Sequence, residues 1–68
     1  MIKGIEKLSQ EQKDHMYKTN GFHTQIVGLD YKSGMEIIET WLDENNTVCV
    51  RLKNGEWYHY YTKDGTWW

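Results

Sequence analysis

The 68-residue sequence contains no proline, no alanine and only one cysteine, Cys49. A secreted domain of this size usually depends on paired cysteines, so a single cysteine favours a cytoplasmic location. No apolar run approaches the roughly 20 residues that a membrane span requires. The N-terminal MIKGIEKLSQ also lacks the apolar block of a signal peptide. We therefore expect a cytoplasmic protein with no membrane partner.

The sequence also has no basic cluster. Ten acidic and eight basic residues give a formal net charge of −2, and the two signs are interspersed along the chain. General nucleic-acid binding depends on clustered Lys and Arg side chains that neutralise phosphates, so we do not expect it here. Frequent Lys, Asn, Ile and Tyr beside a single arginine is typical of AT-rich genomes, and suggests a phage or mobile-element origin.

Aromatic residues, by contrast, are concentrated at the C-terminus, where six of the ten lie in the last twelve positions. Each large ring buries about 150 to 250 Å² when it joins a core. A chain this short has little other apolar area, and small domains often gain stability by oligomerising. We expect a single domain over 1–68 that forms a homodimer, most simply through the free edge of its last strand.

Three parts are predicted along the chain: an N-terminal arm at 1–8, a helix at 9–20 and an antiparallel sheet at 22–68. Ser9 and Gln12 form a capping box, and Asn20-Gly21 supplies a left-handed stop. The turn motifs DYKSG, DENN, NG and KDG then separate runs rich in β-branched and aromatic residues. These runs are FHTQIVGL, MEIIETWL, TVCVRLK and EWYHYYT, with TWW as a short fifth. The predicted fold class is α+β, with one N-terminal helix packed on an antiparallel meander of four to five strands.

The segment 34–44 has two interpretations. Ile37, Ile38, Trp41 and Leu42 fall on one helical face, and Ser33 with Glu36 repeats the capping-box pattern. Against a helix, the acidic pair in DENN would lie at the negative end of the helix dipole. DENN also fits a three-residue hairpin loop with Asn46 in the left-handed conformation. We favour the strand.

The loop lengths predict which residues share a face of the sheet. A two-residue loop at Asn54-Gly55 places Cys49 opposite Tyr60, and a three-residue loop at 44–46 places Trp41 opposite Cys49. The face expected to form the core, with His59 at its margin, carries Ile38, Leu42, Val48, Val50, Leu52, Trp57 and Tyr61. The second face carries Ile37, Glu39, Trp41, Cys49, Arg51, Tyr58 and Tyr60.

No catalytic or metal centre is expected. The sequence lacks CxxC, HxxxH and HExxH spacings, and this register puts Cys49 and His59 on opposite faces. Cys49 is therefore predicted to be a reduced, half-buried thiol that binds no metal. Because Cys49 and His59 are expected on opposite faces, they are not expected to form a nucleophile–base pair. Ser9 and Ser33 are assigned to a helix cap and a turn. We expect a protein with no enzymatic activity and no cofactor.

The second face predicts a binding function, because Trp, Tyr and Arg are enriched at interface hot spots. The predicted binding residues are Trp41, Arg51, Tyr58, Tyr60 and Trp68. We expect an accessory or inhibitor protein that acts by binding another protein, or a second copy, through this aromatic face. The alternative is a nucleotide-like ligand stacked on Trp41 or Tyr60, with Arg51 contacting its anionic group.

Overall fold

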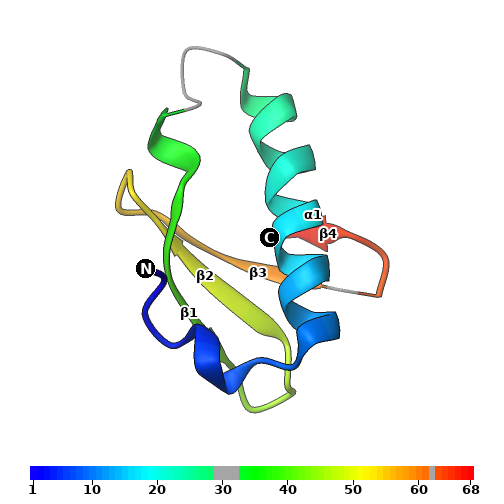
Figure 1. The fold of residues 1–68 in the computed structure, drawn as a ribbon. Coiled ribbons are helices and arrows are strands. Elements are labelled where there is room, and N and C mark those ends of the chain that lie inside the picture. Colours follow the sequence, from blue (N-terminus) through cyan, green and yellow to red (C-terminus); the bar gives the residue numbers. More distant parts are fainter. Residues whose placement is uncertain (29–32, 62) are drawn as a thin grey trace.

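The computed structural model describes residues 1–28, 33–61 and 63–68 of the chain. One long helix lies against one face of a four-stranded antiparallel sheet with strand order β1-β2-β3-β4 (Figure 1). The elements are η1 (Ile5–Lys7), α1 (Gln10–Val27), β1 (Ile37–Leu42), β2 (Val48–Leu52), β3 (Trp57–Tyr61) and β4 (Thr66–Trp67). The predicted α+β class with an antiparallel meander is confirmed.

Helix α1 begins where the sequence predicted and ends seven residues later than predicted. The Ser9–Gln12 capping box is present, with both reciprocal hydrogen bonds formed. The helix then continues through Asn20 and Gly21 and stops at Gly28, whose φ is 88°. The predicted helix stop at Asn20-Gly21 is therefore wrong, and so is the predicted strand over FHTQIV. Leu29 and residues 30–32 of the DYKSG turn lie outside the described residues. The helix tolerates Gly21, at a cost of about 1 kcal/mol relative to alanine, because the turns on either side of it pack on the sheet.

The segment 37–42 is a strand, so the helical alternative for 34–44 is wrong. A register shift lies between Ile37 and Glu39, because Ile37 pairs with Leu52 while Glu39 pairs with Arg51. A shift of this kind is a β-bulge, and it reverses the two isoleucines relative to the prediction. Ile37 is buried in the core, and Ile38 is exposed.

The two hairpins differ in how well the sequence predicted them. In the first, Trp41 pairs with Cys49 and Asn46 has a φ of 61°, so the three-residue loop at 44–46 is confirmed. In the second, the amide of Leu52 donates to the carbonyl of Glu56, which leaves a three-residue loop rather than the predicted two-residue loop. Gly55, with a φ of 93°, takes the left-handed position at the end of that loop.

This longer loop shifts the pairing of β2 and β3 by one residue. Val50 pairs with Tyr58, and Cys49 pairs with His59. A one-residue slip turns every side chain of the affected strand to the other face. The predicted faces of β3 are therefore exchanged: Tyr58 and Tyr60 face α1, and Trp57, His59 and Tyr61 face away from it.

The core lies between α1 and the sheet. Its buried members are Leu8, Met16, Met35, Ile37, Val48, Val50, Leu52 and Tyr60. The N-terminal arm extends the sheet at its β1 edge, where Lys3 pairs with Glu39 through hydrogen bonds to Ile38 and Thr40. At the opposite edge, β4 confirms the short additional strand predicted from TWW. In the described part of the chain, no helix is both long and apolar enough to span a membrane.

Candidate functional site: the open face of the sheet

The sheet face turned away from α1 is the candidate site, and we call it the open face. It carries Glu39, Trp41, Asp43, Cys49, Arg51, Trp57, His59, Tyr61 and Trp68. Of the predicted binding residues, Trp41, Arg51 and Trp68 lie on this face. The predicted positions of Tyr58 and Tyr60 on it are wrong, because Tyr60 is fully buried on the α1 side and Tyr58 packs against the same core.

Aromatic rings form a continuous row across the open face. The ring centroids of Trp41 and Trp57 are 5.9 Å apart, and those of Trp57 and His59 are 5.0 Å apart. His59 then stacks on Trp68 at 4.7 Å with only 8° between the ring planes, and Trp68 contacts Tyr61 at 6.4 Å. Trp57 is 48% exposed and Trp68 is 60% exposed, so the row presents its surface to solvent.

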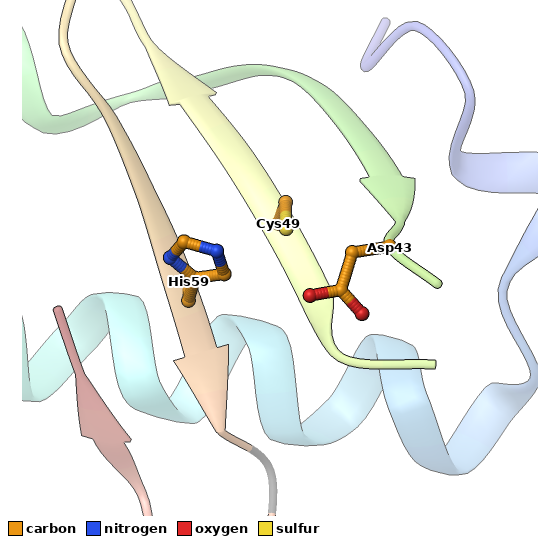
Figure 2. A group of neighbouring side chains, drawn as sticks. All are labelled: Asp43, Cys49 and His59. Atoms are coloured by element: carbon orange, nitrogen blue, oxygen red, sulfur yellow. The ribbon is translucent and has the colours of Figure 1, made fainter. Parts of the chain in front are cut away.

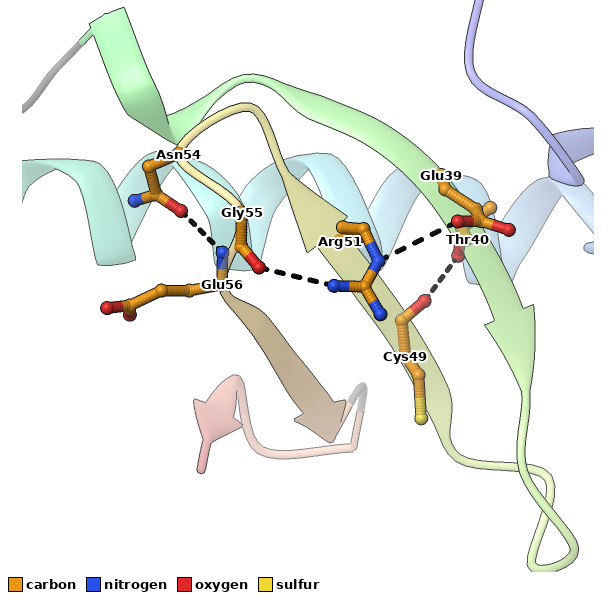
Figure 3. A network of polar contacts seen from close by, with 7 residues as sticks. All are labelled: Glu39, Thr40, Cys49, Arg51, Asn54, Gly55 and Glu56. Carbon is orange, nitrogen blue, oxygen red and sulfur yellow. Dashed lines mark hydrogen bonds and ion pairs between the residues drawn. The ribbon is translucent and has the colours of Figure 1, made fainter.

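Arg51 lies beside the row and is held by three contacts, of which those to Glu39 and Gly55 are drawn in Figure 3. Its Nε is 3.8 Å from a carboxylate oxygen of Glu39, and its Nη1 donates to the carbonyl of Gly55 at 3.2 Å. The guanidinium carbon lies 6.0 Å from the centre of the Trp41 ring, at the outer limit of a cation–π contact. The charge of Arg51 is thus partly balanced within the chain.

Asp43, Cys49 and His59 form a cluster on the same face, one from each of three successive segments of the sheet (Figure 2). One ligand atom from each side chain lies within 4.8 Å of the others. The prediction that Cys49 and His59 lie on opposite faces is wrong, because they are a direct cross-strand pair. The available signal was the sequence KNG, since a three-residue loop ending in glycine is the next most common hairpin connection after the two-residue type.

Cys49 differs in burial from its prediction. It was expected to be half buried between Trp41 and Tyr60, but it is 1% exposed and its β3 neighbour is His59. Burial raises the pKa of the Cys49 thiol, and the nearby carboxylate of Asp43 raises it further. The free cysteine therefore stays protonated at neutral pH, with its Sγ 3.7 Å from the carbonyl of Thr47. A buried, protonated thiol is a poor nucleophile, so the Cys-His pair does not resemble an activated catalytic site.

On the other side of the sheet, polar groups of α1 hold Tyr60. Asn20 donates to the Tyr60 hydroxyl at 3.1 Å and to the carbonyl of Met35 at 2.9 Å. The same hydroxyl lies within hydrogen-bond distance of Nδ1 of His23, at 2.9 Å. Burial lowers the pKa of His23, with a smaller opposing effect from Glu56, and burial raises the pKa of Tyr60 to about 12. These groups are satisfied by one another, which is the pattern of a structural network.

Cavities lined by described residues also lie away from the open face. A cavity of about 390 Å³ is lined by α1 and the β3–β4 turn, including His15, Lys18 and Lys63. A second of about 350 Å³ lies against Val27 and Tyr58. Neither includes Trp41 or Arg51, the residues predicted to hold a nucleotide.

Comparison of the chain with protein families, with curated proteins and with solved structures finds no significant match.

Proposed function

We propose that this protein is a non-enzymatic binding protein that engages another protein through its open face. The observation that supports the proposal is the exposed aromatic row from Trp41 to Trp68. Contiguous exposed rings on a small domain are costly in water and typically mark an interaction surface. Tryptophan, tyrosine and arginine are also the side chains that contribute most to protein interfaces.

The charges on the open face favour a protein partner over nucleic acid. Glu39 and Asp43 contribute two carboxylates, and Arg51 is the one lysine or arginine in the set that defines the face. Phosphate would be repelled by this balance, whereas an apolar protein patch with basic residues at its margin would be complementary. The partner we expect is a folded protein with such a patch.

The nucleotide alternative is less well supported. Its proposed stacking residue Tyr60 is fully buried, and its proposed anion contact Arg51 already lies beside Glu39. Small-ligand sites are usually concave, and neither of the two cavities described above is lined by the aromatic row. Saturable quenching of tryptophan fluorescence by a nucleotide would nevertheless support this alternative.

A binding role of this kind needs no chemistry. A small domain inhibits or adapts its partner by covering a surface that the partner uses elsewhere, and affinity then depends on a few central rings. The accessory or inhibitor role is proposed on this basis.

The decisive experiment isolates the partner and measures its affinity for matched variants. The full chain is used to purify co-eluting proteins from the native host, and the purified partner is then titrated against each variant. We expect Trp57→Ala and Trp68→Ala to weaken binding by about 1 to 4 kcal/mol without lowering the melting temperature strongly. The matched control is Tyr17→Ala, because Tyr17 is 52% exposed but lies on α1.

Equal loss of affinity for Tyr17→Ala and Trp57→Ala would contradict the proposal, as would unchanged binding by both tryptophan variants. A second copy of the chain is a competing occupant of the same face. If the purified chain forms a dimer that the same tryptophan variants dissociate, the open face is a self-association surface.

A further inference from the structure

Asp43, Cys49 and His59 combine three different ligand atoms in one place, and the protein-binding proposal does not use them as ligands. We propose that these three side chains bind a zinc-like divalent cation on the open face. The carboxylate comes from the turn after β1, the thiol from β2 and the imidazole from β3 (Figure 2).

The chemistry of the three donors selects the metal. Zinc is bound in proteins by Cys sulfur, His nitrogen and carboxylate oxygen, whereas Mg²⁺ and Ca²⁺ take oxygen ligands almost exclusively. Thiolate and imidazole together favour Zn²⁺ and the closely similar Co²⁺. When the cation binds, the thiol proton leaves to solvent and a metal–sulfur bond forms, with no oxidation or reduction.

The distances are compatible with a tetrahedral site after a small adjustment. Bonds of about 2.0 to 2.3 Å to a tetrahedral zinc place neighbouring ligand atoms roughly 3.3 to 3.8 Å apart. The three atoms already lie within 4.8 Å of one another, so they need to close by about 1 to 1.5 Å at most. Small adjustments of the partly exposed side chains of Asp43 and His59, within the contacts that orient them, supply a movement of this size.

The surrounding contacts hold two of the ligands in place. Oδ1 of Asp43 accepts hydrogen bonds from the amides of Asn45 and Thr47, both at 2.9 Å. These bonds fix the carboxylate and leave Oδ2 outside them. The His59 ring is stacked on Trp68, which restricts its rotation. Such outer contacts are what a metal site needs to orient its ligands.

Three protein ligands leave one position of a tetrahedron for water or another donor. A closed structural zinc site would need a fourth protein ligand, whereas an open position suits a site that is completed from outside. Because the cluster lies on the open face, a donor atom from a bound protein partner could take that position. The metal site itself does not depend on such a partner.

The proposal is tested with the full chain and Co²⁺ as the probe. We expect one Co²⁺ per chain, with thiolate-to-cobalt charge-transfer absorption that disappears when Zn²⁺ is added. Cys49→Ser should abolish that absorption, and Asp43→Asn and His59→Gln should each weaken Co²⁺ binding by at least about 10- to 100-fold. Asn at position 43 still accepts the two amide hydrogen bonds, so this variant removes a charged ligand and retains the turn. His15→Gln, which changes a helix residue outside the cluster, should bind Co²⁺ like the parent.

A second measurement covers the case in which Cys49→Ser does not fold. Excess Zn²⁺ should raise the melting temperature of the parent chain by mass action, and Asp43→Asn and His59→Gln should reduce that shift. The proposal is overturned if the parent shows no thiolate-to-cobalt absorption in excess Co²⁺. It is equally overturned if Cys49→Ser retains stoichiometric Zn²⁺, or if His15→Gln is as damaging as His59→Gln.

Discussion

Replacing Tyr60 with alanine should unfold the domain, whereas replacing Trp57 should leave it folded. Tyr60 is fully buried against α1, and its hydroxyl contacts Asn20 and His23. Trp57 lies three residues earlier on the same strand but faces the other way and is 48% exposed. The two variants therefore report which face of β3 is the core.

The magnitudes follow from burial and hydrogen bonding. Removing a buried aromatic side chain costs about 3 to 5 kcal/mol, and a buried polar partner left unsatisfied adds about 1 to 3 kcal/mol. A domain of this length has a total stability of roughly 3 to 10 kcal/mol, at about 0.05 to 0.15 kcal/mol per residue. Tyr60→Ala therefore removes most or all of it. Trp57→Ala loses its ring contacts with Trp41 and His59 on the exposed face, each of which contributes about 1 kcal/mol or less.

The assay is urea unfolding followed by far-ultraviolet circular dichroism, because tryptophan fluorescence would change with the Trp57 variant itself. Tyr60→Phe removes only the hydroxyl, so it should cost about 1 to 3 kcal/mol and remain measurable even if Tyr60→Ala does not fold. Comparable destabilisation by Trp57→Ala and Tyr60→Ala would refute the reasoning. Such a result would mean that β2 and β3 are not paired in the register that places Val50 opposite Tyr58.

Three further predictions concern pH, backbone and assembly. Burial lowers the pKa of His23, so its imidazole takes up a proton more readily in the unfolded chain than in the folded one. The free energy of unfolding should therefore fall as the pH drops below about 6.5, and level off below the folded-state pKa. Urea titrations should show this slope in the parent and a flatter one in His23→Gln; a pH-independent parent between about pH 7 and pH 5 would contradict it. Gly4→Ala should destabilise the fold by about 1 kcal/mol or more, because φ at Gly4 is 86° and a Cβ there would collide with the Thr40 carbonyl. Gly21→Ala, in the middle of the helix with open space around it, should instead stabilise the fold by about 0.5 to 1 kcal/mol. Multi-angle light scattering at high micromolar concentration should give a dimer mass, and a monomer mass would refute edge pairing through β4.

Local chemistry was enough to predict the start of the helix and the first hairpin. Ser9 and Gln12 form their capping box within a single helical turn. The left-handed Asn46 lies in a loop whose two hydrogen-bonded flanking residues are four positions apart in the sequence. Features of this kind depend on neighbouring residues alone, so a sequence pattern contains most of the information needed.

The end of the helix was not predictable in the same way. Asn20-Gly21 has the chemistry of a stop, but Asn20 instead uses its amide group to contact Met35 and Tyr60 from the helix interior. Those partners are 15 and 40 residues away in the sequence. Contacts over that distance outweigh a local propensity of about 1 kcal/mol, and the true stop at Gly28 is an equally plausible glycine.

The prediction of the β3 register was wrong for a different reason, because the sequence NG is compatible with hairpin loops of two or three residues. The choice between them depends on which aromatic residues α1 can accommodate. The helix presents two polar groups to the sheet, Asn20 and His23, and a phenol hydroxyl satisfies both of them. The observed register supplies that hydroxyl from Tyr60. The alternative would turn Trp57, His59 and Tyr61 toward the helix and leave Tyr60 in solvent.

The same slip determines what the open face contains. With Cys49 opposite Tyr60, the sulfur would have an aromatic neighbour in place of the imidazole, and the Asp43 carboxylate would be its one remaining neighbour from the cluster. With Cys49 opposite His59, the thiol, the imidazole and the Asp43 carboxylate converge, and His59 also joins Trp57 and Trp68 in one row. The aromatic binding surface and the proposed cation site therefore share a cause, which is the pair of polar helix side chains that draws Tyr60 into the core. If the Tyr60 and Trp57 variants refute this register, both proposals lose their geometry together.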